Sequence, residues 1–75
     1  MAVSTISVLG RNIYRYRRGL GFSQFELARR SGVIQGTISQ LESGKQQDVF
    51  VRHALALARA LDVSVEELME GRGEA

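Results

Sequence analysis

Cysteine and proline are absent from all 75 residues. Without cysteine the chain forms neither a disulfide framework nor a thiolate metal site, which fits a reducing cytoplasm. Without proline no helix interior loses a backbone hydrogen bond, which suits an all-helical fold. His53 is the single histidine, and no pair of carboxylates lies near it in the sequence. We therefore expect no metal site and no cofactor.

Long apolar stretches are missing as well. No run approaches the roughly 18 apolar residues that cross a bilayer. The N-terminal stretch "MAVSTISVLGRN" lacks the basic segment and the apolar core of a signal peptide. Hydrophobic residues make up 44% of the chain, as in globular proteins, and its length predicts one domain over 1–75 with one small core. We expect a soluble, cytoplasmic protein with no membrane partner.

Charge is divided unevenly along the chain. Residues 1–45 hold seven basic and two acidic residues, a net charge of +5, whereas residues 46–75 hold three basic and six acidic residues, a net charge of −3. A basic end favours a polyanionic partner. Solvated charges on the surface of a small domain explain the same division equally well on charge alone.

Apolar residues recur every three or four positions and predict five helices, with no alternating pattern that indicates a sheet. The stretches "SQFE" and "SVEE" have the Ser and Glu spacing of capping boxes at two helix starts. The helices are expected at about 5–19 behind Ser4, 23–32, 34–43, about 49–61 behind Asp48, and from 64 to about 70. Their buried positions are expected to be Ile6, Leu9, Ile13, Tyr16, Leu20, Leu27, Ala28, Val33, Ile34, Ile38, Leu41, Phe50, Ala54, Leu57, Leu61, Val65 and Leu68, with Phe25 and Met69 beside them.

The second and third helices are separated by the three residues "SGV", with Gly32 in the middle. A short turn that contains Gly joins two helices at a steep angle in the helix-turn-helix arrangement. Gly32 suits the turn because one residue there adopts a positive φ. Ala28 is small, as the close crossing of two helices requires. The spacing predicts a helix-turn-helix over 23–44.

The outer face of the third helix lacks the Glu, Lys and Arg of an ordinary exposed helix. Gln donates and accepts at once, and its amide matches the N6 and N7 edge of adenine in the major groove. Gly36 removes bulk where a helix backbone approaches DNA. The face therefore favours DNA reading over the alternative of a merely polar surface. It consists of Gln35, Gly36, Ser39, Gln40 and Ser43.

From "LGRNI" through "SQFELARRSGVIQGTISQLESGK" to "ALARALDVSVEELMEG", over about residues 7–71, the chain resembles the Cro/repressor (XRE-type) helix-turn-helix family. This family includes phage repressors, restriction–modification controller proteins and antitoxins. The resemblance implies an all-α, compact five-helix lambda-repressor-like domain. Its function would be transcription regulation, as a repressor or controller that binds a palindromic operator as a homodimer. Two departures stand out: Ile34 replaces the usual Ser or Thr N-cap, and Gly36 occupies a position where a base-reading side chain is often found.

The residues divide into expected roles. By resemblance Gln24 binds a phosphate, Gln35, Gly36 and Gln40 face base edges, and Arg17 pairs with Glu42. The small hydroxyl of Ser39 joins the base-reading set, and exposed arginines add phosphate contacts. The expected DNA-backbone contacts are Gln24, Thr37, Ser43, Lys45, Arg11, Arg15 and Arg52.

One recognition helix reads few base pairs, so a two-fold dimer is expected to read half-sites roughly 34–36 Å apart. The fourth and fifth helices have apolar faces broad enough for this interface, although Phe50 and Val65 also suit the core. The candidates are Val49, Phe50, Val51, Val63, Val65 and Met69.

No enzyme is expected. "GTISQLESGK" has the wrong spacing for a phosphate-binding loop, and no motif frames a nucleophile. The competing hypothesis is a protein-interaction module that docks a toxin, an antirepressor or RNA polymerase. Residues 1–4 are expected to form a flexible arm, and residues 72–75 a fraying tail.

Overall fold

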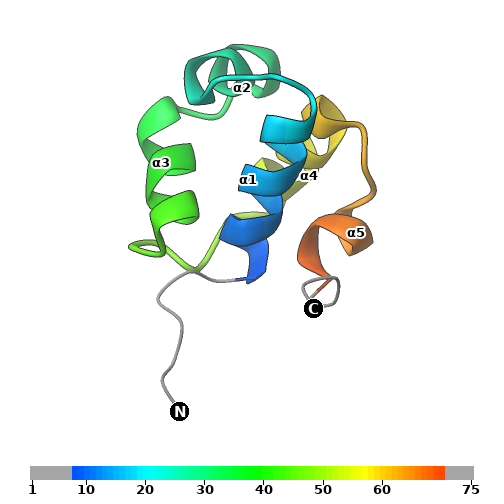
Figure 1. Ribbon diagram of the computed structural model, residues 1–75. Coiled ribbons are helices and arrows are strands. Elements are labelled where there is room, and N and C mark those ends of the chain that lie inside the picture. Colours follow the sequence, from blue (N-terminus) through cyan, green and yellow to red (C-terminus); the bar gives the residue numbers. More distant parts are fainter. Residues whose placement is uncertain (1–7, 71–75) are drawn as a thin grey trace.

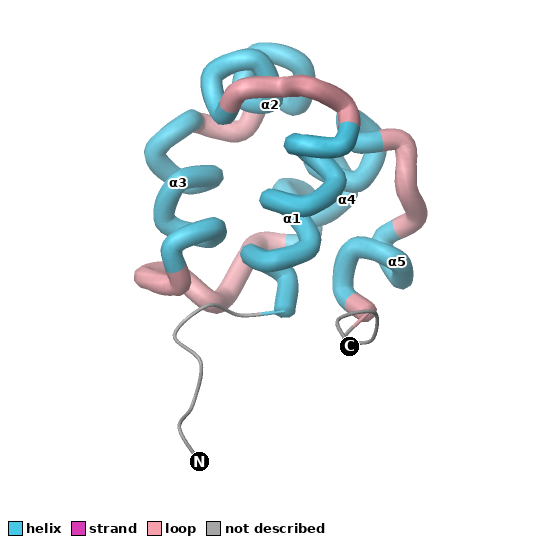
Figure 2. Tube along the Cα trace, viewed as in Figure 1, coloured by secondary structure: helices cyan, strands magenta, loops and turns pink. Residues whose placement is uncertain are grey.

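The computed structural model describes residues 8–70, and over this range the chain forms five helices and no strand (Figures 1 and 2). The all-α prediction is confirmed. The expected start of the first helix near residue 5, its Ser4 cap, the arm at 1–4 and the tail at 72–75 lie outside the described residues. Within 8–70 no helix is both long and apolar enough to cross a membrane. The helices are α1 (Val8–Gly19), α2 (Gln24–Ser31), α3 (Gln35–Ser43), α4 (Val51–Leu61) and α5 (Val65–Met69).

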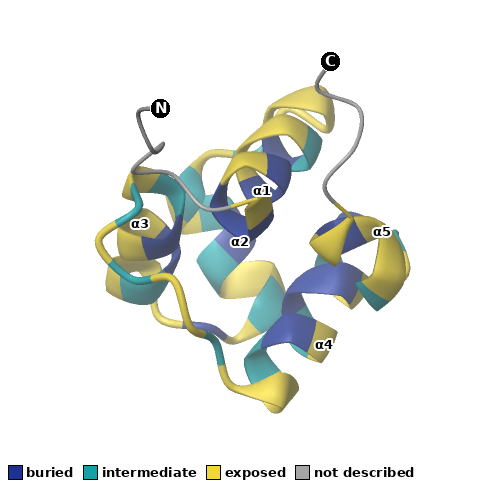
Figure 3. Cartoon of the chain, turned by 90° about the horizontal axis from the view of Figure 1, so that it is seen from below, coloured by how far each residue is buried: buried dark blue, intermediate teal, exposed yellow. Residues whose placement is uncertain are grey.

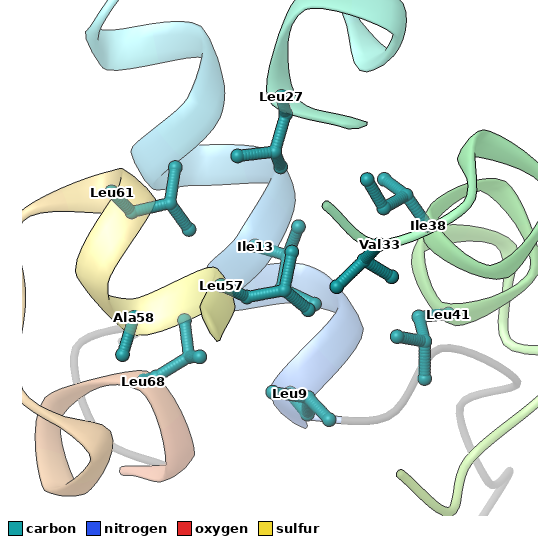
Figure 4. Close-up of a cluster of buried hydrophobic side chains, with 10 residues drawn as sticks. All are labelled: Leu9, Ile13, Leu27, Val33, Ile38, Leu41, Leu57, Ala58, Leu61 and Leu68. Carbon is teal, nitrogen blue, oxygen red and sulfur yellow. The ribbon is translucent and has the colours of Figure 1, made fainter. Parts of the chain in front are cut away.

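Helix α1 lies at the centre of the fold, with α3 on one side and α5 on the other, while α2 packs across α3 and α4 (Figure 1). The buried side chains come from all five helices and point toward one another between them (Figure 4). Figure 3 colours the residues by burial, and the buried residues lie on the sides of the helices that face the interior. The fully buried large side chains are Ile13, Leu27, Ile38, Leu41, Leu57 and Leu68.

Local hydrogen bonds explain where the helices begin. Ser64 Oγ accepts from the Glu67 N–H at 3.0 Å, and Glu67 Oε1 accepts from the Ser64 N–H at 2.9 Å, so the predicted capping box of α5 is complete. At α2, Ser23 Oγ accepts from the Glu26 N–H at 2.9 Å. The Glu26 carboxylate, however, binds two arginines one turn further on. Of the predicted capping box at α2, the bond accepted by Ser23 is therefore present, while the Glu26 carboxylate binds arginines instead.

The helix-turn-helix has the predicted glycine geometry. Gly32 has φ 79° in the left-handed region, and its N–H donates to the Ala28 carbonyl at 2.8 Å, which ends α2. A side chain at this φ would strain the backbone. Val33 then enters the core. The turn over Ser31–Ile34 is thereby fixed by backbone conformation on one side and by apolar burial on the other.

Several predicted core positions are wrong. Ile34 is 74% exposed, and Phe25 and Phe50 are each 65% exposed, while Leu20 and Met69 are also exposed. Ile34 and Phe50 are N-cap residues, so they precede the turn at which the helix would bring them onto its inner stripe. Leu20 similarly lies beyond the end of α1.

Helix α4 begins later than predicted, at Val51 rather than near 49, and its N-cap is Phe50 rather than Asp48. The preceding loop has its own hydrogen bonds. The Gln46 N–H donates to the Gln40 carbonyl at 3.0 Å, and Gln46 Nε2 donates to the Asp48 carbonyl at 2.9 Å. These bonds hold the loop against the end of α3 and keep it out of the helix.

Helices α1 and α3 approach each other closely at Gly10. A Cβ added there would lie 1.9 Å from the Leu41 carbonyl oxygen and 2.9 Å from its carbon. No side chain fits into that space, because the obstructing atoms belong to the backbone. Gly10 therefore sets the separation at which α1 supports α3.

Candidate nucleic-acid interface

Helix α3 presents a neutral polar surface to solvent. Gln35, Gly36, Ser39 and Gln40 are all exposed, and we call these four residues the reading face. The opposite side of the helix carries Ile38 and Leu41, both with no exposed surface. The buried pair fixes the rotation of the helix about its axis. Burial of Ile38 and Leu41 therefore keeps the reading face turned outward.

The two ends of α3 differ. Gly44 ends it with φ 88°, in the left-handed region. Ile34 stands at the N-cap and makes no side-chain capping bond, as the sequence predicts for a residue without a hydroxyl. The Ile34 carbonyl accepts from the N–H groups of Thr37 and Ile38 at 3.0 and 3.2 Å. The helix thus begins with an exposed apolar side chain directly beside the reading face.

A buried ion pair ties α3 to α1 and α2. Arg17 Nε lies 2.8 Å from Glu42 Oε2, and Arg17 Nη2 lies 3.0 Å from Glu42 Oε1. The two side chains are only 8% and 7% exposed. Arg17 Nη1 also donates to the Phe22 carbonyl at 2.8 Å. Hydrogen bonding to Glu42 raises the pKa of Arg17, which favours the charged guanidinium that the pair requires.

Gln24 belongs to the same network. Its Nε2 donates to Glu42 Oε1 at 3.0 Å, so the side chain at the start of α2 is oriented by the end of α3. The amide has a second N–H and an oxygen beyond this bond. The predicted phosphate-binding residue is thus held in place by the predicted ion pair.

Beside the reading face lies an open hollow of about 340 Å³ between α1, α2 and α3. Three predicted backbone-contacting residues, Arg11, Gln24 and Ser43, line it together. Lys45 is exposed in the loop just beyond α3. Arg15 on α1 and Arg52 on α4 are exposed as well, and none of the three belongs to this lining. The full lining is Arg11, Tyr14, Gln24, Ser39, Glu42 and Ser43.

Tyr14 joins this surface from α1. Its hydroxyl accepts from Arg18 Nη1 at 2.9 Å, and the guanidinium carbons of Arg17 and Arg18 lie 5.3 and 5.5 Å from its ring centroid. Cation–π contacts of this kind hold arginines against an aromatic ring. Tyr14 therefore holds the exposed Arg18 against α1 near the hollow, while the charge of Arg17 is neutralised by Glu42.

Two residues support the site in ways that the sequence patterns did not predict. Gly10 sits inside a helical pattern, where a glycine costs stability and so signals a packing reason. Asn12 is 4% exposed, and its Nδ2 donates to the Leu68 and Glu70 carbonyls, each at 2.8 Å. It thus ties α1 to the end of α5. In the sequence, the signal for this role is a polar residue directly before the core residue Ile13.

The predicted dimer residues divide into two groups. Phe50, Val51 and Met69 are exposed. The other three pack against the core while keeping part of their surface accessible: Val49, Val63 and Val65. Among residues 8–70 no group of three or more potential metal ligands is present.

The α2–turn–α3 unit, with its left-handed glycine and an exposed polar second helix, defines a helix-turn-helix protein. The chain belongs to the helix-turn-helix family of the Cro/repressor (XRE) type, whose model matches residues 13–68. It is 31% identical over 67 residues to the HTH-type transcriptional regulator SinR of Bacillus subtilis. That match covers 89% of this chain and 60% of SinR, so the chain spans less than two thirds of this relative.

Solved structures extend the similarity. The N-terminal DNA-binding domain of Bacillus subtilis SinR superposes with a TM-score of 0.85 at 31% identity, covering 89% of this chain and 97% of that one. The restriction–modification controller protein C.AhdI of Aeromonas hydrophila gives 0.76 at 33% identity, covering 81% and 91%. The P22 c2 repressor, in complex with a synthetic operator, gives 0.76 at 31% identity, covering 85% and 96%.

Proposed function

We propose that the protein is a sequence-specific double-stranded DNA-binding regulator of transcription, a repressor or controller, that inserts α3 into the major groove. The observation that carries this proposal is the reading face: four exposed, uncharged residues on a helix whose opposite side is fully buried. A helix that reads bases must come within hydrogen-bond distance of their edges. The similarity to a repressor solved with its operator supports the same function.

Within the reading face, Gln35 and Gln40 are the residues that discriminate bases. A glutamine amide pairs with adenine through two hydrogen bonds, and such a pair contributes about 1–3 kcal/mol of discrimination. Gly36 leaves open space, because a Cβ there would meet nothing within 4 Å in the free protein. That space lets the backbone of α3 approach the DNA. Ser39 adds a small hydroxyl beside Gln40.

Affinity is proposed to come from contacts to the DNA backbone. Arg11, Gln24 and Ser43 line the hollow between the helices, where a phosphate would meet a guanidinium and the second amide N–H of Gln24, beside a Ser43 hydroxyl that donates to the Gln40 carbonyl in the free protein. Such contacts position the protein and weaken as salt rises. Outside the hollow, the remaining proposed backbone contacts are Thr37, Lys45, Arg15 and Arg52.

A second copy of the chain would supply the other half-site. Two-fold dimers place recognition helices about 34–36 Å apart, one turn of DNA. The exposed Phe50, Val51 and Met69 are the proposed contacts, with the partly buried valines beside them. The protein is proposed to act in the cytoplasm, with neither catalytic activity nor a cofactor.

The test is enrichment of bound duplexes from a random library. Wild-type protein should select a palindromic sequence, and Gln35→Ala and Gln40→Ala should each relax selection at one pair of symmetric positions. Gln47→Ala is the matched control, because Gln47 is an exposed glutamine in the loop after α3. It should select the wild-type sequence. Absence of any enriched sequence at low salt would overturn the proposal and favour a protein-docking module instead.

A further inference from the structure

Ile34 stands at the start of α3 with its large apolar side chain in solvent, and the residue is 74% exposed. It stands at the N-cap and provides no capping hydrogen bond. A Ser or Thr would be the favourable residue there. The position therefore carries an isoleucine at a cost to helix stability and with its side chain in water. Neither local structure nor core packing accounts for this choice.

The surroundings of Ile34 form a shallow apolar groove. It has a volume of about 350 Å³ and lies between α2 and the start of α3. Phe25 of α2, itself 65% exposed, and Gln35 of the reading face both line it. Arg29 lines it as well, with its side chain 63% exposed and its Nη2 atom 2.7 Å from Glu26 Oε2. The groove thus brings apolar side chains and an exposed arginine together and shares Gln35 with the reading face.

We propose that Ile34 is a specificity-determining residue that contacts the 5-methyl group of a thymine next to the base read by Gln35. This inference rests on the proposed function. In the major groove the methyl group is the apolar feature that marks thymine, and aliphatic side chains recognise it by contact. Ile34 and Gln35 line the same groove, so a helix that brings Gln35 to a base edge brings Ile34 close to the neighbouring base pair. The guanidinium of Arg29 is complementary to the phosphate that flanks such a site.

DNA accounts for this groove better than a protein partner does. The groove shares Gln35 with the reading face, and the charged residue in its lining is Arg29. A protein docked there would cover Gln35 and block base reading. A thymine methyl instead uses both features in the same bound complex.

The test uses the duplex enriched by the wild-type protein. Each thymine of a half-site is replaced in turn by deoxyuridine, which removes the methyl group alone. One position should weaken wild-type binding about fourfold, the effect of burying one methyl group, and the symmetric double replacement should weaken it about tenfold or more. Ile34→Ser and Ile34→Ala should bind the thymine and deoxyuridine duplexes equally well.

The variants separate folding from recognition. Ile34→Ser supplies an N-cap oxygen and should be at least as stable as the wild type. Leu20→Ala is the control, since Leu20 is an exposed aliphatic residue in the turn after α1, and it should keep the full methyl effect. If wild-type binding is sequence-specific but no deoxyuridine effect depends on Ile34, this inference is wrong and the proposed function stands. If the wild type selects no sequence at all, the proposed function itself is wrong.

Discussion

Within residues 8–70 both halves of this small domain bury apolar side chains, but only one of them adds a buried ion pair. The half that carries the reading face, α1 to α3, supplements its apolar core with that ion pair, an attached glutamine and a close backbone approach at Gly10. The half formed by α4 and α5 relies chiefly on apolar burial of Leu57, Leu61 and Leu68. Directional polar contacts fix orientation, whereas apolar packing tolerates small adjustments. The surface proposed to meet DNA is therefore the more rigidly specified one.

Charge follows the same division. The basic residues concentrate in the first 45 positions and the acidic ones in the last 30. In the proposed function the net negative charge of residues 46–75 favours DNA on the side of the first half, because like charges repel, and Arg52 is the one proposed backbone contact outside that half. DNA binding is thus proposed mainly for the first half and assembly for the second, and substitutions in each half test that difference.

The largest effect is expected from Glu42→Ala. It leaves the Arg17 guanidinium buried without its carboxylate and should cost about 3–5 kcal/mol of unfolding free energy. Because Gln24 loses its anchor as well, DNA affinity should fall even where the protein is still folded. Urea denaturation followed by circular dichroism measures the first effect and titration of the selected duplex the second.

Arg30→Ala is the matched comparison, since Arg30 pairs with Glu26 at an exposed site in the same helix-turn-helix. Exposed pairs contribute little, so stability should barely change. The double substitution Arg17→Met with Glu42→Leu should recover part of the loss, because no charge stays buried. Equal losses of unfolding free energy from Glu42→Ala and Arg30→Ala would show that the buried ion pair stabilises the protein no more than the exposed one.

Gly10→Ala should come next. The added methyl meets the Leu41 carbonyl oxygen, and overpacking of this kind costs about 1–3 kcal/mol. Gly19→Ala is its control on the same helix, because a Cβ at Gly19 meets nothing within 4 Å. That change should be neutral or stabilise by about 0.5–1 kcal/mol. If both variants unfold at the wild-type denaturant concentration, α1 and α3 do not need their close approach.

Asn12→Ala tests the link between the halves. It removes two hydrogen bonds to the Leu68 and Glu70 carbonyls and should cost about 2 kcal/mol. The loss should fall on α5, where amide hydrogen exchange should quicken more than in α3. If amide hydrogen exchange quickened equally in α3 and α5, the two halves would unfold as one unit, and the difference between them would not extend to their stability.

Much of this architecture follows from patterns visible in the chain. The periodic apolar residues predict five helices, and "SGV" predicts the turn at Gly32, because spacing and glycine conformation are local properties. Helix starts are harder. Ile34 and Phe50 continue an apolar stripe in the sequence but stand at N-caps, where a helix has not yet brought the side chain inward. Periodicity sets the phase of a helix and leaves its first residue open.

The candidate site divides in a similar way. The polar composition of the α3 face and the resemblance together indicate the reading face and the pairing of Arg17 with Glu42. The contact of Gly10 with Leu41 and the bonds of Asn12 to α5 depend on how helices cross in space, which no spacing along one helix encodes. Gln24 likewise gains its partner Glu42 only through tertiary packing.

The smallest effect is expected from acidification at the exposed pair. Glu26 Oε2 accepts from Arg29 Nη2 at 2.7 Å and from Arg30 Nε at 2.6 Å, and these bonds lower the pKa of Glu26. A carboxyl whose folded pKa lies below its unfolded value of about 4.3 stabilises the protein above that pH. The contribution disappears as pH falls through the folded pKa. The melting temperatures of wild type and Glu26→Gln should therefore differ slightly at neutral pH and converge as the pH falls through the lowered pKa of Glu26. High salt should shrink the neutral-pH difference, as screening does for exposed charges. If the two melting temperatures still differed by the same amount in acid, Glu26 would act through packing and not through its charge. The contrast between this exposed pair and the buried pair at Glu42 would then have a cause other than charge.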